Sequence, residues 1–185
     1  MRDTLGRVAV VARFKPVHNG HEIVLRTLAD RAGELCIGLG SSNRYNARNP
    51  FTAVESAAMI HLVLGHRMER CKLLEIPDLD DGPRWKEMVR GMLGGLDVFV
   101  TANPYVRNLM EECYCVVHPA SLIRPEEQVP VDGTMVRLAM ARGERWLGLV
   151  PEPVAEYIRQ NGLDTRFREQ FGLAALACAL EPPKP

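Results

Sequence analysis

The chain has 185 residues, enough for one domain with a substantial core, and 23 basic side chains balance 23 acidic ones, so the formal net charge is zero. A neutral chain has no global field to attract nucleic acid or a membrane, so phosphate recognition must be local. Five cysteines, an odd number with irregular spacing, indicate a reducing compartment rather than a disulfide framework. The longest uncharged apolar run near the end is far short of the ~20 residues that span a bilayer, and the first residues do not resemble a signal peptide, so we expect a cytoplasmic protein.

Strand-like and helix-like segments alternate through the first two thirds of the chain. Apolar runs predict strands at residues 8–12, 35–40, 72–77, 97–101 and 114–117. Helical spacing of apolar residues predicts helices at about 19–32, 53–65, 83–93 and 104–112. Thr52 and Glu55 match a capping box at the start of the second helix. This alternation favours an α/β, Rossmann-like open parallel sheet of about five strands with helices on both faces.

The last third has a different character. Helices are expected at about 134–141, 151–161 and 163–180, before a frayed tail at 181–185. With no internal repeat or linker, we expect one domain over 1–185, made of a core at 1–118, an irregular charged loop at 119–131 and C-terminal helices at 132–180. Cys113, Cys115 and His118 lie close enough in sequence for a metal cluster to be considered, but buried thiols beside a strand are the simpler interpretation.

The segment from residue 7 to residue 21 carries the clearest chemical signal. A strand buried on both faces runs into a turn around Pro16, and His18 and His21 flank the start of the first helix. Such a helix start favours an anion, because its backbone N–H groups are unpaired and the helix dipole is positive there. A turn is normally at the surface, so neither histidine is expected to be a passive core residue.

Five stretches in order carry a resemblance to a known family. Residues 13–21 contain His-x-Gly-His, and residues 132–137 read Asp-Gly-Thr-Met-Val-Arg, which resembles the nucleotidyltransferase superfamily. Residues 38–42, 48–53 and 103–107, together with Trp85, are similar to the archaeal type of nicotinamide-nucleotide adenylyltransferase over residues 7–162. The resemblance implies transfer of the adenylyl group of ATP to nicotinamide or nicotinate mononucleotide, in NAD biosynthesis. That chemistry asks the protein mainly for positioning and charge neutralisation.

The same resemblance implies roles for individual residues. The catalytic set is His18, His21, Thr134 and Arg137. The ATP-binding set is Phe14, His18, His21, Gly38, Gly40, Arg48, Asn103, Asp132, Gly133, Thr134 and Arg137. The mononucleotide-binding set is Arg13, Lys15, Ser41 and Trp85. Backbone N–H groups at the helix start near Thr134 would hold the β- and γ-phosphates, and the missing side chains of Gly38 and Gly40 would let the nucleotide lie against the backbone.

Mg²⁺ is expected to accompany ATP, held by phosphate oxygens and water rather than by a protein metal site. The expected partners are ATP and a mononucleotide, with no nucleic acid and no membrane, and relatives of this type suggest a homo-oligomer. For three residues a simpler interpretation stays open. One of the two histidines would only cap the turn, Arg48 would be a solvated loop residue, and Trp85 would be a core residue at the start of a helix.

Four departures from the family pattern leave the acceptor open. The turn at residues 78–82 is about two residues short, and Ser56, Asp132 and Met135 replace the usual arginine, serine and glutamate. An aspartate is a good helix N-cap, but it places negative charge beside a polyphosphate site. The alternatives are therefore a nucleotidyltransferase acting on another phosphate-bearing acceptor, such as phosphopantetheine or a sugar or alcohol phosphate, and a non-catalytic ATP-binding regulator of the same fold.

Overall fold

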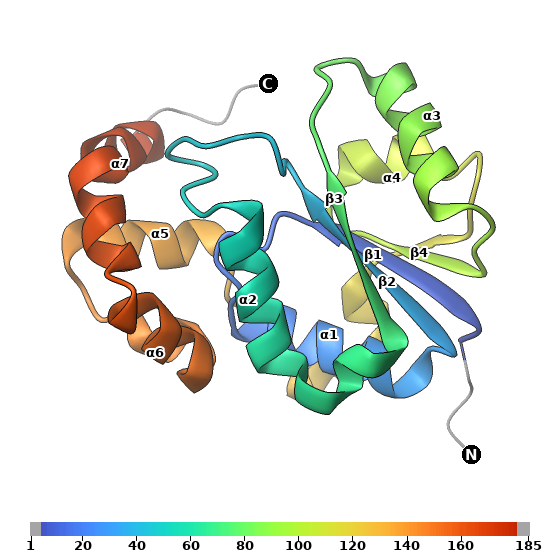
Figure 1. Cartoon of the computed structure of the whole chain (residues 1–185), viewed down its shortest axis with the longest axis horizontal. Coiled ribbons are helices and arrows are strands. Elements are labelled where there is room, and N and C mark those ends of the chain that lie inside the picture. The colour runs from blue at the N-terminus through green and yellow to red at the C-terminus, as the bar shows by residue number, and fades with distance from the viewer. Residues whose placement is uncertain (1–4, 181–185) are drawn as a thin grey trace.

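A computed structural model describes residues 5–180, and its centre is one five-stranded sheet in which all strands are parallel (Figure 1). The strand order is β3-β2-β1-β4-β5. The strands are β1 (Arg7–Ala12), β2 (Glu34–Gly40), β3 (Cys71–Ile76), β4 (Val98–Val100) and β5 (Val116–Val117). The predicted α/β, Rossmann-like parallel sheet is confirmed.

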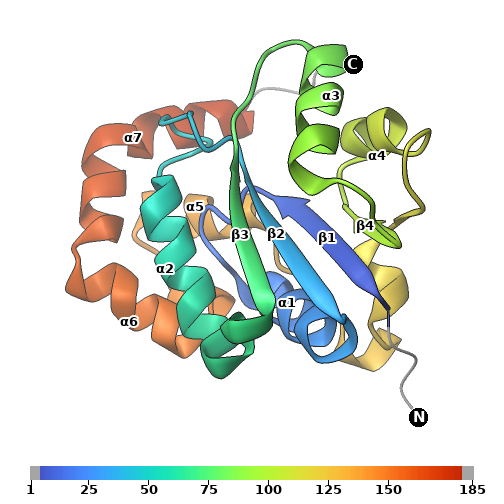
Figure 2. The same cartoon turned by 45° about the vertical axis from the view of Figure 1, so that its right-hand side comes forward.

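Helices cover both faces of this sheet, as Figure 2 shows after a turn of 45° from the view of Figure 1. The main helices are α1 (Asn19–Arg31), α2 (Ala53–Leu64), α3 (Gly82–Leu93), α4 (Pro104–Met110), α5 (Gly133–Arg142), α6 (Glu152–Gln160) and α7 (Leu163–Leu180). Short 3₁₀ helices are η1 (Gly65–Arg70), η2 (Pro119–Leu122), η3 (Pro125–Glu127) and η4 (Leu147–Leu149). Helices α1, α2 and α5–α7 lie on one side of the sheet, and α3 and α4 on the other (Figure 1, Figure 2).

The alternation of side chains along β1 divides the core into two layers. Val8 and Val10 belong to the larger apolar cluster, with residues of α1, α2 and α5–α7. Ala9 and Val11 point the other way and join the smaller cluster under α3 and α4. Because successive residues of a strand face opposite sides, a strand covered on both faces is apolar throughout.

Most element boundaries match the predictions to within one to three residues. The capping box at Thr52 and Glu55 is present. Two predictions need correction: β5 covers Val116–Val117 only, and the 119–131 segment contains η2 and η3 rather than being fully irregular. The expectations for the first four residues and for the 181–185 tail lie outside the described residues. Within residues 5–180, no helix is both long and apolar enough to cross a membrane.

The strand order places the functional residues. The chain builds β1, β2 and β3 outward in one direction and then returns to add β4 and β5 on the other side of β1. In open parallel sheets, ligands bind in the crevice beyond the carboxyl ends of the strands where the order reverses, here between β1 and β4.

Candidate active site

A cleft of about 1170 Å³ opens at this edge of the sheet. Its walls come from the segments that follow all five strands, from the first turn of α1 and from the start of α5. Every site residue expected from the sequence lines it except Gly38: Arg13, Phe14, Lys15, His18, His21, Gly40, Ser41, Arg48, Trp85, Asn103, Asp132, Gly133, Thr134 and Arg137. Segments up to 124 residues apart, from Arg13 to Arg137, therefore meet in one cleft.

His18 both caps helix α1 and faces the cleft. Its Nδ1 accepts a hydrogen bond from the backbone N–H of His21 at 3.3 Å, so the neutral ring carries its proton on Nε2 and is a donor there. The two imidazoles stack with centroids 3.6 Å apart. The ring of Phe14, a residue with φ +52°, lies 4.7 Å from that of His21. A non-glycine residue at positive φ is strained, and such strain is typical of functional sites.

Burial keeps both histidines neutral. It lowers the pKa of His18 to about 4, with Arg137 lowering that pKa further and Asp132 opposing the effect. Burial also holds the pKa of His21 well below 6.5, and the neighbouring His18 lowers it again. The prediction that this turn lies at the surface is wrong, because His18 is buried along with residues 14–17. Both rings are therefore uncharged at neutral pH, and each has one N–H to donate. For His21, a hydrogen bond to the Pro16 backbone raises the pKa and opposes the effect of burial.

Lys15 is the residue that ties this turn to the loop after β2. Its ammonium donates to the carbonyl oxygens of Ser41 at 2.8 Å and Arg44 at 3.2 Å. Burial lowers the pKa of Lys15 to about 8, an effect that Asp78 opposes. The ammonium of Lys15 thus donates two hydrogen bonds to the loop after β2. Its expected contact with the mononucleotide phosphate stays a prediction.

The start of α5 is joined directly to the same turn. Arg137 Nη1 donates to the carbonyl oxygen of Lys15 at 2.9 Å, and Nη2 donates to the hydroxyl oxygen of Thr134 at 3.2 Å. These bonds bring Thr134 and Arg137 to the end of the cleft that holds the histidines, which is what a shared triphosphate site requires.

Asp132 changes how the α5 helix start is used. Its Oδ1 accepts from the backbone N–H groups of Thr134 at 2.7 Å and Met135 at 2.9 Å. Both belong to the backbone N–H groups expected to hold the β- and γ-phosphates, so a carboxylate of the protein already occupies two of these donors. The phosphate contact at this helix start stays a prediction. The hydroxyl of Thr134 and the guanidinium of Arg137 remain as contacts that α5 can offer to an anion, together with the backbone N–H of Gly133, which Asp132 Oδ1 does not bind.

Three arginines gather around this end of the cleft. Burial lowers the pKa of Arg137 to about 10, and Arg13 and Arg48 lower it further. The pKa of Arg13 is lowered by burial and then by Arg48. Like charges held this close repel one another, so the arrangement favours a multivalent anion that neutralises them. This supports the reading of Arg48 as more than a solvated loop residue.

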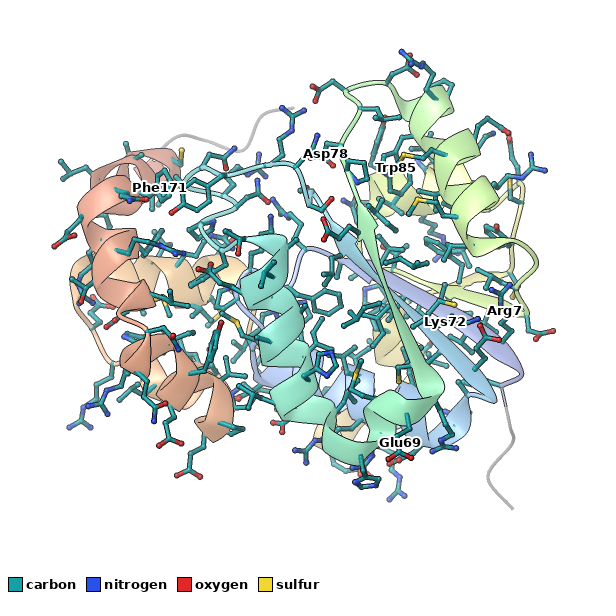
Figure 3. The ribbon with its side chains drawn as sticks, in the orientation of Figure 1. Arg7, Glu69, Lys72, Asp78, Trp85 and Phe171 are labelled. Atoms are coloured by element: carbon teal, nitrogen blue, oxygen red, sulfur yellow. The ribbon has the colours of Figure 1, made fainter. Side chains whose placement is uncertain are left out.

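The opposite end of the cleft is built around Trp85. This side chain lines the cleft and also packs on the core layer under α3 and α4 (Figure 3), so it does contribute to the core, and its stacking on a nicotinamide ring stays a prediction. The shortened turn beside it is locked to the loop after β2: Asn43 Nδ2 donates to the Asp78 carbonyl at 2.9 Å, and Asp78 N–H donates back to Asn43 Oδ1 at 2.8 Å. Arg44 pairs with the carboxylates of Asp78 and Asp80.

Gly38 does not line the cleft, and the prediction that it lies against the nucleotide is corrected. A Cβ at this position would come 2.5 Å from Ile76 Cδ1 and 3.0 Å from Val11 Cγ2, so the glycine lets neighbouring strands pack. Asn103 caps α4 by accepting from the backbone N–H of Tyr105 and Val106, which leaves its amide N–H groups for a ligand.

Sequence reasoning missed part of the cleft wall. It includes residues between His118 and Val131, as well as Tyr105 and the nearly buried Asn49, whose side-chain oxygen lacks a hydrogen-bond partner. The position of the 119–131 segment directly after the fifth strand was the signal available. Within residues 5–180, no three His, Cys, Asp or Glu side chains form a metal-binding group, and Cys115 is exposed rather than buried.

Comparisons with known proteins identify the family. The family model described as cytidylyltransferase-like matches residues 9–139. The nicotinamide-nucleotide adenylyltransferase of Methanosarcina acetivorans is 35% identical over 164 residues, which is 88% of this chain and 92% of that protein. The one of Thermoplasma volcanium is 35% identical over 170 residues, 88% of this chain and 91% of that protein.

A solved structure shows the shared fold. It is the bifunctional NMN adenylyltransferase/ADP ribose pyrophosphatase of Francisella tularensis, complexed with AMP and a manganese ion. It matches with a TM-score of 0.70 and 15% sequence identity over 100% of this chain, which spans 58% of the length of that protein. On the strength of the sequence relatives, this chain belongs to the cytidylyltransferase-like family and, within it, to the archaeal-type nicotinamide-nucleotide adenylyltransferases.

Proposed function

We propose that this protein transfers the adenylyl group of ATP to nicotinamide mononucleotide, in the synthesis of NAD. The observation that carries the proposal is the meeting of His18, His21, Thr134 and Arg137 at one end of a cleft whose other end presents Trp85. Sequence relatives named for this activity support the same choice.

The reaction joins two phosphates. An oxygen of the mononucleotide 5′-phosphate forms a bond to the α-phosphorus of ATP, the bond from that phosphorus to the bridging oxygen of the β-phosphate breaks, and NAD and pyrophosphate are the products. The nucleophile is already an anion and pyrophosphate is a good leaving group, so no side chain has to act as a base. Catalysis then depends on positioning and on stabilising the charge that develops on the phosphates.

We assign that stabilisation to the histidine pair and to the arginines. The Nε2–H of His18 is directed away from its capping bond, and with His21 it would donate to the α-phosphate or to the leaving group. Arg137 and Arg48 would neutralise the β- and γ-phosphates, while Arg13, at the end of β1, would hold the phosphate of the mononucleotide. Trp85 would stack on the nicotinamide ring.

A divalent cation fits this arrangement as a companion of ATP. We expect Mg²⁺ to be held mainly by phosphate oxygens and water. Bound there, the cation would neutralise phosphate charge. We also expect a homo-oligomer, and a reducing compartment such as the cytoplasm is consistent with the five free cysteines.

Product analysis tests the proposal. The protein is incubated with ATP and Mg²⁺ and one acceptor at a time: nicotinamide mononucleotide, nicotinate mononucleotide or phosphopantetheine. Pyrophosphate is measured, and the product is identified by mass spectrometry. We expect NAD and pyrophosphate in equal amounts with the amide mononucleotide. Turnover with phosphopantetheine alone would favour the alternative that the short, locked 78–82 turn motivates, and ATP binding without pyrophosphate release would favour a non-catalytic regulator.

A further inference from the structure

No described residue of the C-terminal helix α7 lines the cleft, but this helix contacts both elements that carry arginines toward the triphosphate end. We name residues 45–50 the nucleotide loop, because this segment between β2 and α2 presents Arg48. Asn46 shapes it by accepting, through Oδ1, from the backbone N–H groups of Arg48 at 3.0 Å and Asn49 at 3.1 Å. On its other side, α7 packs along α5, the helix of Arg137 (Figure 1).

Arg166 is the main link from α7 to the nucleotide loop. Its Nη1 donates to Glu55 Oε1 at 2.6 Å, and Nη2 donates to Glu55 Oε2 at 2.8 Å and to the carbonyl oxygen of Pro50 at 3.1 Å. The pair is partly shielded from solvent, with side chains 28% and 14% exposed. A two-pronged guanidinium–carboxylate contact in such a place fixes orientation as well as charge.

Tyr45 adds a second link at the opposite end of the loop. The Arg166 guanidinium carbon lies 5.7 Å from the centre of the Tyr45 ring. The same ring meets Phe171 edge-on at 5.1 Å (Phe171 is labelled in Figure 3), and its hydroxyl donates to Gln170 Oε1 at 2.7 Å. One turn and a half of α7 therefore holds both ends of the nucleotide loop.

The preceding residues of the chain are held by different contacts. Ser41 and Arg44 receive hydrogen bonds from Lys15, and Asn43 and Arg44 are bound to Asp78. Loosening α7 would thus free the nucleotide loop and leave residues 41–44, which face the acceptor end, in place. The two ends of the cleft have separate supports.

We infer that Arg166 is a positioning residue for ATP: it holds the nucleotide loop in the conformation in which Arg48 faces the triphosphate. The inference rests on the proposed function. Without the link, ATP would have to order the loop on binding, and the loss of conformational entropy would weaken the binding of ATP. The mononucleotide, bound at the other end, would not meet this cost.

The test compares Arg166→Gln with a matched control on the same helix. Among the residues that the structure describes, the hydrogen-bond partners of Arg168 are Asp164 and Thr165 of the same helix, so Arg168→Gln removes an arginine two residues away without touching the loop. We expect Arg166→Gln to raise the KM for ATP by about tenfold, as for a modestly misplaced binding group, while the KM for nicotinamide mononucleotide changes by less than about twofold. Arg166→Lys keeps the charge but loses the two-pronged contact, so its KM for ATP should lie between those of the wild type and Arg166→Gln. The KM values of Arg168→Gln should match those of the wild type.

Two results with Arg166→Gln would count against the inference. An unchanged KM for ATP in a folded Arg166→Gln protein would overturn it, and so would an equal rise for both substrates, which indicates a general structural effect. If Arg166→Gln does not fold, Tyr45→Ala takes its place, since it detaches the other end of the loop and leaves the Arg166–Glu55 pair intact. The inference then requires that Tyr45→Ala raise the KM for ATP and leave the KM for nicotinamide mononucleotide nearly unchanged. A wild-type protein that makes no dinucleotide would instead reject the proposed function itself.

Discussion

Replacing Asp132 by asparagine removes one negative charge from the triphosphate end of the cleft and keeps the shape of the side chain. The amide oxygen of asparagine can still accept from the N–H groups of Thr134 and Met135, which Asp132 Oδ1 now binds at 2.7 and 2.9 Å. Asparagine and aspartate are comparable N-caps. The substitution therefore separates the electrostatic effect of Asp132 from its structural one.

The size of the effect follows from the distance between charges. A carboxylate roughly 8 Å from a phosphate charge repels it by about 2 kcal/mol at an effective dielectric constant of about 20. Asp132 is exposed, so solvent screening reduces this to about 1 kcal/mol, which corresponds to a KM for ATP lower by about fivefold. Loss of the favourable interaction with the helix dipole, about 0.3–1 kcal/mol, should lower the Tm by about 1–3 °C.

Steady-state kinetics with varied ATP at saturating Mg²⁺ and mononucleotide measure the first effect, and thermal unfolding measures the second. Asp81→Asn is the matched control, since Asp81 caps α3 in the same way, through the backbone N–H of Arg84 at 3.0 Å, at the acceptor end. It should share the small loss of Tm and leave the KM for ATP unchanged. A higher KM for ATP in Asp132→Asn would refute the reasoning and would show that the carboxylate helps to bind the metal complex of ATP.

Three further predictions test other parts of the site. His21→Ala should lower kcat by about 10²-fold, the loss typical of one transition-state hydrogen bond, and near-normal turnover measured with both substrates saturating would exclude that role. Trp85→Ala should raise mainly the KM for the mononucleotide, and an unchanged value would make Trp85 a packing residue only. Because the pKa of His18 is lowered to about 4, its NMR signal should not titrate above pH 5 in the free protein. Unfolding exposes an imidazole of pKa near 6.5 that takes up a proton, so the stabilisation from neutral His18 is present above that pH and is lost as pH falls toward 4.

The fold was predictable because its signals are local. The buried strand at residues 8–12, the capping box at Thr52 and the alternation of strands and helices each depend on neighbouring residues, and parallel topology follows from that alternation. The carboxyl ends of parallel strands share one edge, so residues placed after successive strands could be expected to meet.

What could not be predicted depends on contacts between distant segments. The turn at Pro16 is buried because the loop after β2 and the start of α5 cover it, through Lys15 and Arg137. The Arg166–Glu55 pair joins residues 111 positions apart. Gly38 was assigned to the nucleotide by resemblance, whereas its reason is the neighbouring Ile76 side chain, which only the register of β2 and β3 brings beside it. Patterns among neighbouring residues do not predict contacts between segments that are distant in the sequence.

The central claim is that the paired imidazoles and the tip of α5 act on one triphosphate. A crystal structure with Mg²⁺ and a non-hydrolysable ATP analogue tests it most directly. We predict phosphate oxygens within about 3.2 Å of the ring nitrogens of His18 or His21 and, in the same molecule, of the Arg137 guanidinium. A triphosphate bound elsewhere, or one that reaches only one of these two groups, would contradict the claim.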